Sequence, residues 1–238
     1  MSAPRPPRYE AVLFDALGTL VRLEPPWPLL RANLAADHAI EITEEEAKEA
    51  MRAEMSYYVD HHAEGRDPAS LDELRRRCAG VLGEHLPAGA ELTNEVLVEL
   101  LLDSLRFVPY PDAAPALGRL RAAGIRAAVV SNWDCSLGSV MGELGLGGML
   151  DAIVTSAQAG TRKPEPAIFR TALEHLRCPP ESAILVGDSL ATDVAGGRAA
   201  RIRSVLLDRS GTTADRSDVE TIVTLDNLPE LMRALPVT

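Results

Sequence analysis

The sequence of 238 residues is poor in several features, and each shortage argues against a class of protein. Its three cysteines, Cys78, Cys135 and Cys178, are far apart and lack C-x-x-C spacing, which argues against a disulfide framework and a zinc site. No apolar run approaches the length of a membrane span. The 24 basic residues are outnumbered by 35 acidic ones, and a net charge of −11 disfavours nucleic acid or an anionic membrane as the main partner.

Other shortages bear on the cellular compartment and on the lysines. The first eight residues, M-S-A-P-R-P-P-R, lack the apolar core of a secretory signal, so we expect a cytoplasmic protein with reduced cysteines. Lysine occurs only at positions 48 and 163 among many arginines, which makes each lysine of particular interest. Hydrophobic residues at 46% and charged residues at 25% are ordinary for a globular protein of one large or two smaller domains.

Short apolar runs alternate with helical patterns in most of the chain. Apolar runs predict strands at residues 11–14, 125–130, 152–155, 183–186 and 203–207, with a weaker one at 221–223. Amphipathic patterns predict helices at residues 112–123, 136–144, 164–176 and 192–200. This alternation is typical of βαβ units, so we expect an α/β fold with a parallel sheet.

Residues 29–106 interrupt this alternation with a purely helical pattern of about four helices. Two expected helix starts have capping-box spacing, Thr43 with Glu46 and Ser70 with Glu73. Proline-rich bends at residues 23–28 and 108–111 flank the segment. We therefore expect a helical domain at residues 23–107, inserted into a core formed by residues 1–22 and 108–238.

Polar residues follow four of the predicted strands. Asp15 ends the first strand, Ser131 the second, Lys163 lies in the loop after the third, and Asp188 and Asp193 follow the fourth. Parallel strands bring their carboxyl ends to one edge of the sheet, where ligands of open α/β sheets bind. Phosphoryl transfer needs a nucleophile, hydrogen-bond donors and cations. Asp15 fits the nucleophile, Ser131 a hydroxyl donor, Lys163 the fixed cation, and the last two carboxylates a Mg²⁺ site.

Neighbouring residues complete the candidate site. Gly18 gives a tight turn after Asp15, and the hydroxyl of Thr19 can bond a carboxylate or a phosphate oxygen. Asn132 and Trp133 follow Ser131 and are candidate substrate-binding residues. Simpler interpretations stay open. Ser131 and Asn132 could form a strand-end turn, Lys163 could be a solvated loop residue, and Asp193 could cap the next helix.

The motifs D-x-x-G-T, S-N, K-P and G-D-S-x-x-x-D occur in this order over residues 9 to about 208. In this the chain resembles the haloacid dehalogenase-like (HAD) hydrolase superfamily, and the helical insertion resembles its α-helical cap subclass. The resemblance implies a Rossmann-like core with a mobile cap and a covalent intermediate on Asp15. It also implies Mg²⁺ held by Asp15, Asp188 and the backbone carbonyl of Leu17.

Leu17 departs from the pattern of the family. Phosphatases of the family usually have a second Asp at this position, which acts as general acid for the leaving group and as general base for the attacking water. Its dehalogenases commonly have an aromatic residue there and work without a metal, whereas this chain keeps Asp188 and Asp193. We expect a Mg²⁺-dependent phosphatase acting on a small phosphorylated metabolite. The alternatives are a dehalogenase-type hydrolase that uses an Asp15 ester, and a binding or regulatory protein of the same fold.

Other residues could supply the missing proton or a different chemistry. Asp134 could replace the general acid, and His61 and His62 could do so from the helical insertion. Phosphonatases of the family have a Schiff-base lysine in the cap, but Lys48 lies in a run of glutamates where a helix salt bridge is the better interpretation. Cys135 fits a buried residue better than a reactive one. The expected state is a monomer or a homodimer.

Overall fold

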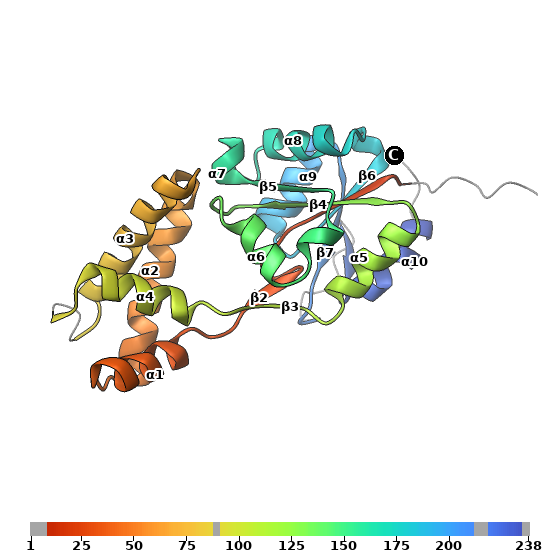
Figure 1. Cartoon of the computed structure of the whole chain (residues 1–238). Helices are drawn as coiled ribbons and strands as arrows, with labels where there is room; N and C mark the ends of the chain where they lie inside the picture. Colours follow the sequence, from red (N-terminus) through yellow and green to blue (C-terminus); the bar gives the residue numbers. More distant parts are fainter. Residues whose placement is uncertain (1–8, 88–90, 212–218, 235–238) are drawn as a thin grey trace, which may run out of the picture. The chain divides into compact units, whose positions relative to one another are not determined.

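The computed structural model describes residues 9–87, 91–211 and 219–234. The chain divides into two compact units. The α/β unit comprises Met1–Arg22, Pro109–Trp133 and Leu137–Thr238, and the helical unit comprises Leu23–Val108 and Asp134–Ser136. Figure 1 labels the helices and strands of both units.

A six-stranded parallel sheet forms the centre of the α/β unit, in the order β5-β4-β1-β6-β7-β8. The strands are β1 (Ala11–Phe14), β4 (Arg126–Ser131), β5 (Ala152–Thr155), β6 (Ala183–Gly187), β7 (Arg203–Leu207) and β8 (Glu220–Ile222). The predicted α/β class with a parallel sheet is thereby confirmed. The weak strand predicted at 221–223 begins one residue earlier.

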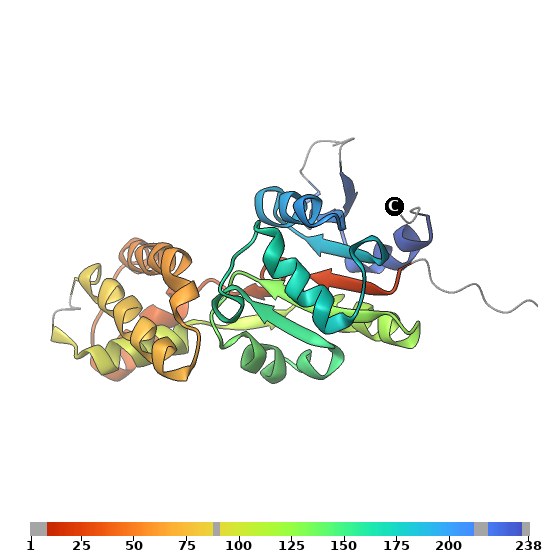
Figure 2. The ribbon, with the colours of Figure 1, turned by 90° about the horizontal axis from the view of Figure 1, so that it is seen from above.

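The first strand is central because all of its side chains are apolar. Residues Ala11–Phe14 are 0% exposed, as expected for a strand with neighbours on both sides and helices on both faces. Ala11 and Leu13 pack in one hydrophobic cluster with Ile168 and Phe169 of α8 (Pro166–Leu176). Figures 1 and 2 show α8 against this face of the sheet. Each such large apolar side chain contributes about 1.5–3 kcal/mol when it is buried.

The other helices of the α/β unit are short. They are α5 (Ala113–Ala122), α6 (Leu137–Glu143), α7 (Ser156–Ala159), α9 (Ala195–Ala200) and α10 (Leu228–Ala234). Single 3₁₀ turns are η3 (Gly147–Met149), η4 (Pro180–Ser182) and η6 (Leu225–Asn227). The helix predicted at 192–200 is instead a π-helical turn, η5 (Leu190–Val194), followed by α9. π-turns of this kind occur frequently at functional sites.

The helical unit contains α1 (Trp27–His38), α2 (Glu44–His61), α3 (Pro68–Glu84) and α4 (Asn94–Ser104), with one 3₁₀ turn, η1 (His62–Glu64). Its described helices share one apolar core, which includes Leu34, Met51, Leu82 and Leu101. The prediction of a helical insertion is confirmed by these elements.

One of the two predicted helix starts is confirmed and the other is wrong. Thr43 and Glu46 form the expected capping box at the start of α2, with a 2.7 Å bond from the Thr43 backbone N–H to Glu46 Oε2. At α3 the cap is Asp67, whose carboxylate accepts the backbone N–H of Ser70 at 2.9 Å. Asp caps at least as well as Ser, and Pro68 favours the first helical turn, so α3 starts before Ser70.

The chain runs between the two units through β2 (Val21–Leu23) and β3 (Phe107–Pro109), which pair with each other. Sequence analysis predicted only proline-rich bends near these positions, because strands of three residues give little periodic signal. A third segment, Asp134–Ser136, follows β4 but belongs to the helical unit. There the backbone N–H of Cys135 donates to the carbonyl of Gly65 at 2.8 Å.

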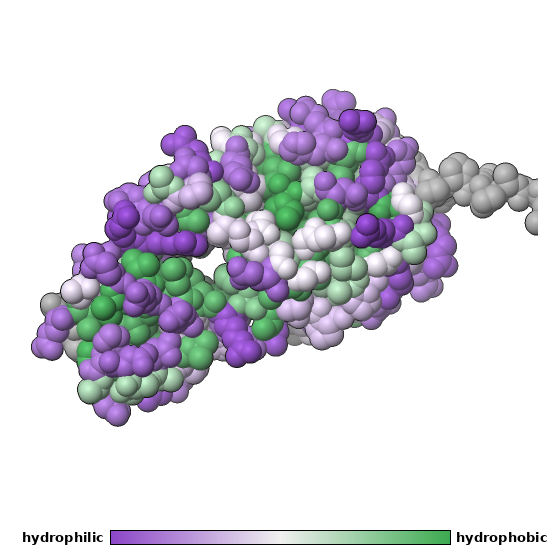
Figure 3. Space-filling model, in the orientation of Figure 1, coloured by the Kyte–Doolittle hydropathy of each residue, from purple (hydrophilic) through white to green (hydrophobic). Residues whose placement is uncertain are grey.

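On the face drawn in Figure 3, hydrophilic and hydrophobic residues are interspersed over both units. Among the described residues, no helix combines the length and the apolar character that a membrane span requires.

Candidate active site

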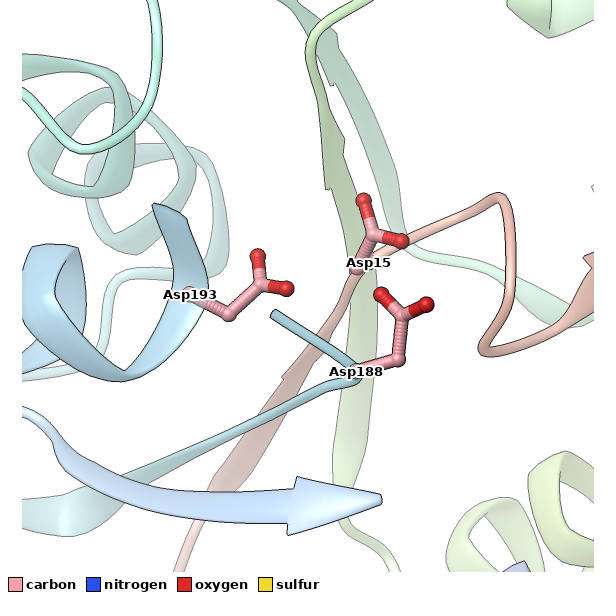
Figure 4. Close-up of side chains that lie close together, drawn as sticks. All are labelled: Asp15, Asp188 and Asp193. Atoms are coloured by element: carbon pink, nitrogen blue, oxygen red, sulfur yellow. The ribbon is translucent and has the colours of Figure 1, made fainter. Parts of the chain in front are cut away.

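Three aspartates converge at the carboxyl edge of the sheet (Figure 4). Asp15 follows β1, Asp188 follows β6, and Asp193 lies on the π-turn η5. The register brings them together, because Phe14 of β1 lies opposite Val186 of β6 and the backbone N–H of Asp15 donates to the Val186 carbonyl at 2.9 Å. One carboxylate oxygen from each aspartate lies within 4.8 Å of the others.

Lys163 and Ser131 contact the same oxygen of Asp15. The Lys163 ammonium donates to Asp15 Oδ1 at 2.5 Å and to Asp193 Oδ1 at 2.6 Å. The Ser131 hydroxyl donates to Asp15 Oδ1 at 3.1 Å. Lys163 is only 3% exposed, so it is a buried cation between two carboxylates and not a solvated loop lysine.

Asn132 connects two parts of the site. Its side-chain amide donates to the backbone carbonyl of Lys163 at 3.1 Å and its side-chain oxygen accepts the Lys163 backbone N–H at 2.8 Å. Trp133 is 6% exposed, and its backbone N–H donates to the Ser156 hydroxyl at 3.1 Å. In this structure both residues therefore hold neighbouring loops, and their substrate-binding roles stay predictions.

The loop after Asp15 is packed closely against Asp188. Gly18 has a φ of +86°, and a Cβ atom at this position would lie 2.0 Å from Asp188 Oδ2. Only glycine satisfies both conditions. Thr19 is 0% exposed, and its hydroxyl has no hydrogen-bond partner within the described part of the chain. Leu17, by contrast, is 41% exposed.

Asp193 is fixed by its own turn. A Cβ atom at Gly187 would lie 2.3 Å from Asp193 Cγ, so glycine is required for the carboxylate to reach this place. Asp193 Oδ2 accepts the backbone N–H of Ser189 at 3.0 Å. The cap of the turn is Ser189, whose hydroxyl accepts the backbone N–H of Thr192. Asp193 itself therefore lies inside the turn and points at the site (Figure 4).

The charges of the site are unbalanced, because three carboxylates surround a single ammonium group. Loss of water around the Asp188 carboxylate and the charge of Asp15 raise the pKa of Asp188 to about 6. Burial, with the charge of Asp15, also raises the pKa of Asp193 to about 6, against the opposing effect of Lys163. Burial lowers the pKa of Lys163, but the charges of Asp15 and Asp193 outweigh it and raise that pKa.

A hard divalent cation suits this arrangement. Carboxylate and carbonyl oxygens are the ligands that Mg²⁺ prefers, and close carboxylates repel one another without a cation. Asp188 as a residue is exposed, although its carboxylate is partly desolvated, so an ion can reach it from solvent. The residues present therefore fit the metal that the sequence predicts.

The candidates for a replacement general acid lie in the helical unit. Asp134 is 4% exposed; its Oδ2 accepts the Tyr58 hydroxyl at 2.8 Å and its Oδ1 accepts the backbone N–H of Ser136 at 2.7 Å. The ring of His61 stacks on Tyr57 at 3.9 Å, and its Nδ1 lies 2.7 Å from the Tyr57 carbonyl oxygen. His62 is 2% exposed. In this conformation these side chains are engaged within the helical unit.

Lys48 has the structural role expected of it. Its ammonium lies 2.6 Å from Glu44 and 3.0 Å from Glu45 on α2. Cys135 is half-buried, and burial raises the pKa of its thiol, so the thiol is poorly ionised.

Arg209, which no sequence pattern had indicated, lies just after β7 and reaches the Asp15 loop. Its Nε donates to the Gly18 carbonyl at 3.2 Å and its Nη2 to the Thr19 carbonyl at 2.6 Å. Arg209 follows the carboxyl end of the strand predicted at 203–207, and this position was the one signal in the sequence that could have placed it at the site.

Comparison with known proteins identifies the family of the chain. The model of the haloacid dehalogenase-like hydrolase family matches residues 9–201. A glyceraldehyde 3-phosphate phosphatase from Methanothermobacter thermautotrophicus is 27% identical over 95% of this chain and 99% of its own. The human haloacid dehalogenase-like hydrolase domain-containing protein 3 is 31% identical over 82% of this chain and 80% of its own.

Solved structures show the same fold. A HAD phosphatase from Thermococcus onnurineus superposes with a TM-score of 0.64 at 26% identity, covering 94% of this chain and 97% of the other. A 2-haloacid dehalogenase from Pseudomonas syringae superposes with a TM-score of 0.67 at 22% identity, covering 95% and 99%. Because the family model spans most of the chain, the protein belongs to the haloacid dehalogenase-like hydrolases and is a hydrolase.

Proposed function

We propose that the protein hydrolyses a small phosphorylated metabolite in a Mg²⁺-dependent reaction, through an aspartyl-phosphate on Asp15. The observation that carries the proposal is the buried Asp15 carboxylate, held on one oxygen by Lys163 and Ser131 with two more carboxylates within 4.8 Å. The name of the Methanothermobacter relative, a glyceraldehyde 3-phosphate phosphatase, supports a phosphate ester as the substrate class.

The first step is attack by Asp15. Within the part of the chain that the structure describes, the Ser131 and Lys163 bonds to its carboxylate both fall on Oδ1, so Oδ2 is the oxygen available to attack phosphorus. An O–P bond to Asp15 forms, and the bond between phosphorus and the leaving oxygen breaks with its electron pair on that oxygen. Ser131 and Lys163 are placed to offset negative charge on the phosphoryl oxygens.

In the second step water attacks the same phosphorus. The O–P bond to Asp15 breaks, and inorganic phosphate and free Asp15 result. Asp15, Asp188 and the backbone carbonyl of Leu17 would hold Mg²⁺, which supplies positive charge against the phosphoryl group when it is bound. Both oxygens of Asp193 accept hydrogen bonds, from Lys163 and from the Ser189 N–H, so Asp193 adds negative charge and orients Lys163.

Leu17 sets a limit on the leaving group. A leucine cannot protonate a departing alkoxide or deprotonate the attacking water. Asp134, His61 and His62 are all engaged in the helical unit, which supports the absence of a replacement acid. We therefore infer a preference for substrates whose leaving group departs without a proton, such as acyl phosphates.

We further propose that residues 23–107 act as a mobile cap on a catalytic core of residues 1–22 and 108–238. The short strands β2 and β3 are connections that such a movement would bend, and the bonds of Asp134 and Cys135 to Tyr58 and Gly65 are contacts that it would break. Hinges commonly lie at the ends of elements like these.

Dehalogenation is the second candidate, and Leu17 favours it. A halide leaves without a proton, so the missing acid is no handicap in the first step, in which an O–C bond to Asp15 forms and the carbon–halogen bond breaks with its electron pair on the halide. One experiment separates these activities. Purified protein is assayed against phosphoesters, acyl phosphates and 2-haloacids, with Mg²⁺ and with a chelator.

We expect release of phosphate that requires Mg²⁺. Release of halide without Mg²⁺ would establish the dehalogenase instead. No turnover of any substrate, together with Mg²⁺ binding, would favour a binding or regulatory protein. The variant Asp15→Asn is the matched control in each assay.

A further inference from the structure

Arg209 joins the Asp15 loop to Asp112, the residue before α5. Its guanidinium group donates four hydrogen bonds to described residues. Two go to the carbonyls of Gly18 and Thr19, at 3.2 Å and 2.6 Å. The other two go to Asp112, from Nη1 to Oδ2 and from Nη2 to Oδ1, at 3.0 Å each. The guanidinium also lies 3.6 Å from the centre of the Tyr110 ring.

Asp112 is itself held in place. Its Oδ2 accepts the Thr224 hydroxyl at 2.7 Å and the backbone N–H of Leu225 at 2.9 Å. Burial opposes ionisation of Asp112, but the bonds from Arg209 and from Leu225 and Thr224 lower its pKa below the ordinary value. The ion pair is therefore charged at neutral pH, and a bidentate pair of this kind has a defined geometry.

The loop that Arg209 holds is the one that meets Asp188. Gly18 lies so close to Asp188 Oδ2 that a Cβ atom would be at 2.0 Å. On its other side, the Gly18 and Thr19 carbonyls are bound by Arg209. A shift of the loop would change both the spacing of Asp15 from Asp188 and the direction of the Leu17 carbonyl, one residue before Gly18.

We propose that Arg209, held by Asp112, is a positioning residue that fixes the Asp15 loop in the geometry needed for metal binding and catalysis. The part that concerns Mg²⁺ rests on the proposed function. The part that concerns the loop rests only on the contacts of Arg209.

The chemistry of the contacts requires arginine. The guanidinium is planar and presents donors in a fixed fork, so it binds two carbonyls and a carboxylate at once. A lysine keeps the charge but has one nitrogen, which cannot reach all three partners. Arg209→Lys therefore keeps the positive charge and removes the forked set of donors. Arg209→Met removes both the charge and the donors and keeps an unbranched side chain.

The chain offers a matched control. Arg119 of α5 donates to Asp226 Oδ1 at 2.7 Å, so it also forms an arginine–aspartate pair between α5 and the region of η6. Among the described residues, its side chain bonds Asp226 and not the Asp15 loop. Arg119→Met removes a pair of the same type without touching the candidate site.

Three measurements test the proposal on folded variants, with melting temperature as the check of folding. Amide hydrogen exchange of peptides covering residues 15–21 reports on the loop and needs neither metal nor substrate. Calorimetry measures the affinity for Mg²⁺. The third measurement is kcat and KM with acetyl phosphate or p-nitrophenyl phosphate.

In Arg209→Met we expect faster exchange in the loop peptides and an affinity for Mg²⁺ about 10- to 100-fold weaker, the range found for residues that orient metal ligands. We expect kcat to fall with little change in KM. Arg209→Lys should show most of these effects, and Arg119→Met none.

Loop exchange and Mg²⁺ affinity equal to wild type in both Arg209 variants would overturn the proposal. If wild type neither binds Mg²⁺ nor turns over substrate, the proposed function fails. The exchange result then still decides whether Arg209 holds the loop.

Discussion

The side chain of Asn132 holds the backbone of Lys163 from both sides, with bonds of 3.1 Å to its carbonyl and 2.8 Å from its N–H. The Lys163 ammonium in turn lies 2.5 Å from Asp15. Asn132, which directly follows Ser131, thereby joins the end of β4 to the loop that delivers the cation. Asn132 positions Lys163 whether or not it also contacts substrate.

We expect Asn132→Ala to reduce kcat by about 10²-fold, because a displacement of about 1 Å of a charged group is enough for such a loss. The free energy of unfolding should fall by about 1–3 kcal/mol, which is the contribution of two neutral hydrogen bonds. Steady-state kinetics and urea unfolding measure the two effects. Asn94→Ala is the control, since Asn94 also bonds a backbone carbonyl, that of Arg76, but in the helical unit. Equal kinetics in both variants would remove Asn132 from the mechanism.

Asp15→Asn should remove turnover while the fold stays intact. The amide has the shape of the carboxylate but is not a nucleophile at phosphorus, and its charge no longer opposes that of Asp188. Phosphate release and circular dichroism measure the outcome, with the exposed pair residue changed in Asp226→Asn as control. Near-native activity of Asp15→Asn would mean that the covalent mechanism is wrong.

Mg²⁺ should raise the melting temperature of the wild-type protein by mass action. An ion at 100 times its dissociation constant adds about 2.7 kcal/mol to the free energy of unfolding. Asp188→Ala removes one of the carboxylates that lie within 4.8 Å of one another, so its shift should be much smaller. Differential scanning fluorimetry over a series of Mg²⁺ concentrations tests this. Equal shifts in the two proteins would show that the ion binds elsewhere.

The pH dependence of the metal-free protein follows from Asp188. Its pKa is about 6 in the folded state, against about 3.9 in an unfolded chain, so the folded state binds the proton more tightly. This contribution to stability is present in full below about pH 4 and is lost as the pH rises through about 6. With a chelator present, the melting temperature should therefore fall from pH 5 to pH 7.5, and fall less in Asp188→Asn. The same decrease in both proteins would assign the effect to other groups.

The strands and the polar residues at their ends could be predicted because both signals are local. Four apolar residues at 11–14 predict a buried strand, and Asp15 directly after them marks its end. Parallel pairing then brings Asp15 and Asp188 to one edge without further information. The sequence alone could not identify Thr19 as fully buried, because its surroundings come from distant segments.

Other features depend on contacts that sequence patterns do not record. Arg209 bonds Gly18 and Thr19 across about 190 positions of the chain, and no spacing rule links them. Ser70 and Glu73 have the spacing of a capping box, but the helix starts earlier, at Asp67, which is followed by a proline that favours the first turn. Asp134 belongs to the helical unit because of its bond with Tyr58, 76 positions away.

Leu17 stands where a general acid would be needed for an alkoxide leaving group. A positioned general acid typically accelerates a reaction by about 10²–10⁴-fold, and leucine cannot act as one. Turnover of alkyl phosphates should therefore be slow, and acyl phosphates or p-nitrophenyl phosphate should be preferred. Leu17→Asp places a carboxyl group two residues after Asp15, where the side chain is 41% exposed and space is available. This variant should accelerate alkyl phosphate hydrolysis more than hydrolysis of the activated esters.

Leu17→Asn is the matched control, because it has the size and polarity of aspartate but no transferable proton at neutral pH. The ratio of kcat/KM for a sugar phosphate to that for p-nitrophenyl phosphate should rise in Leu17→Asp and stay unchanged in Leu17→Asn. The ratio cancels any common effect on Mg²⁺ binding or on stability. If wild type already hydrolyses a sugar phosphate at about 10 per second, a normal enzyme rate, another group supplies the proton. Substitution of Asp134, His61 and His62 in turn would then identify it, since release of any of them from the helical unit would free an acid.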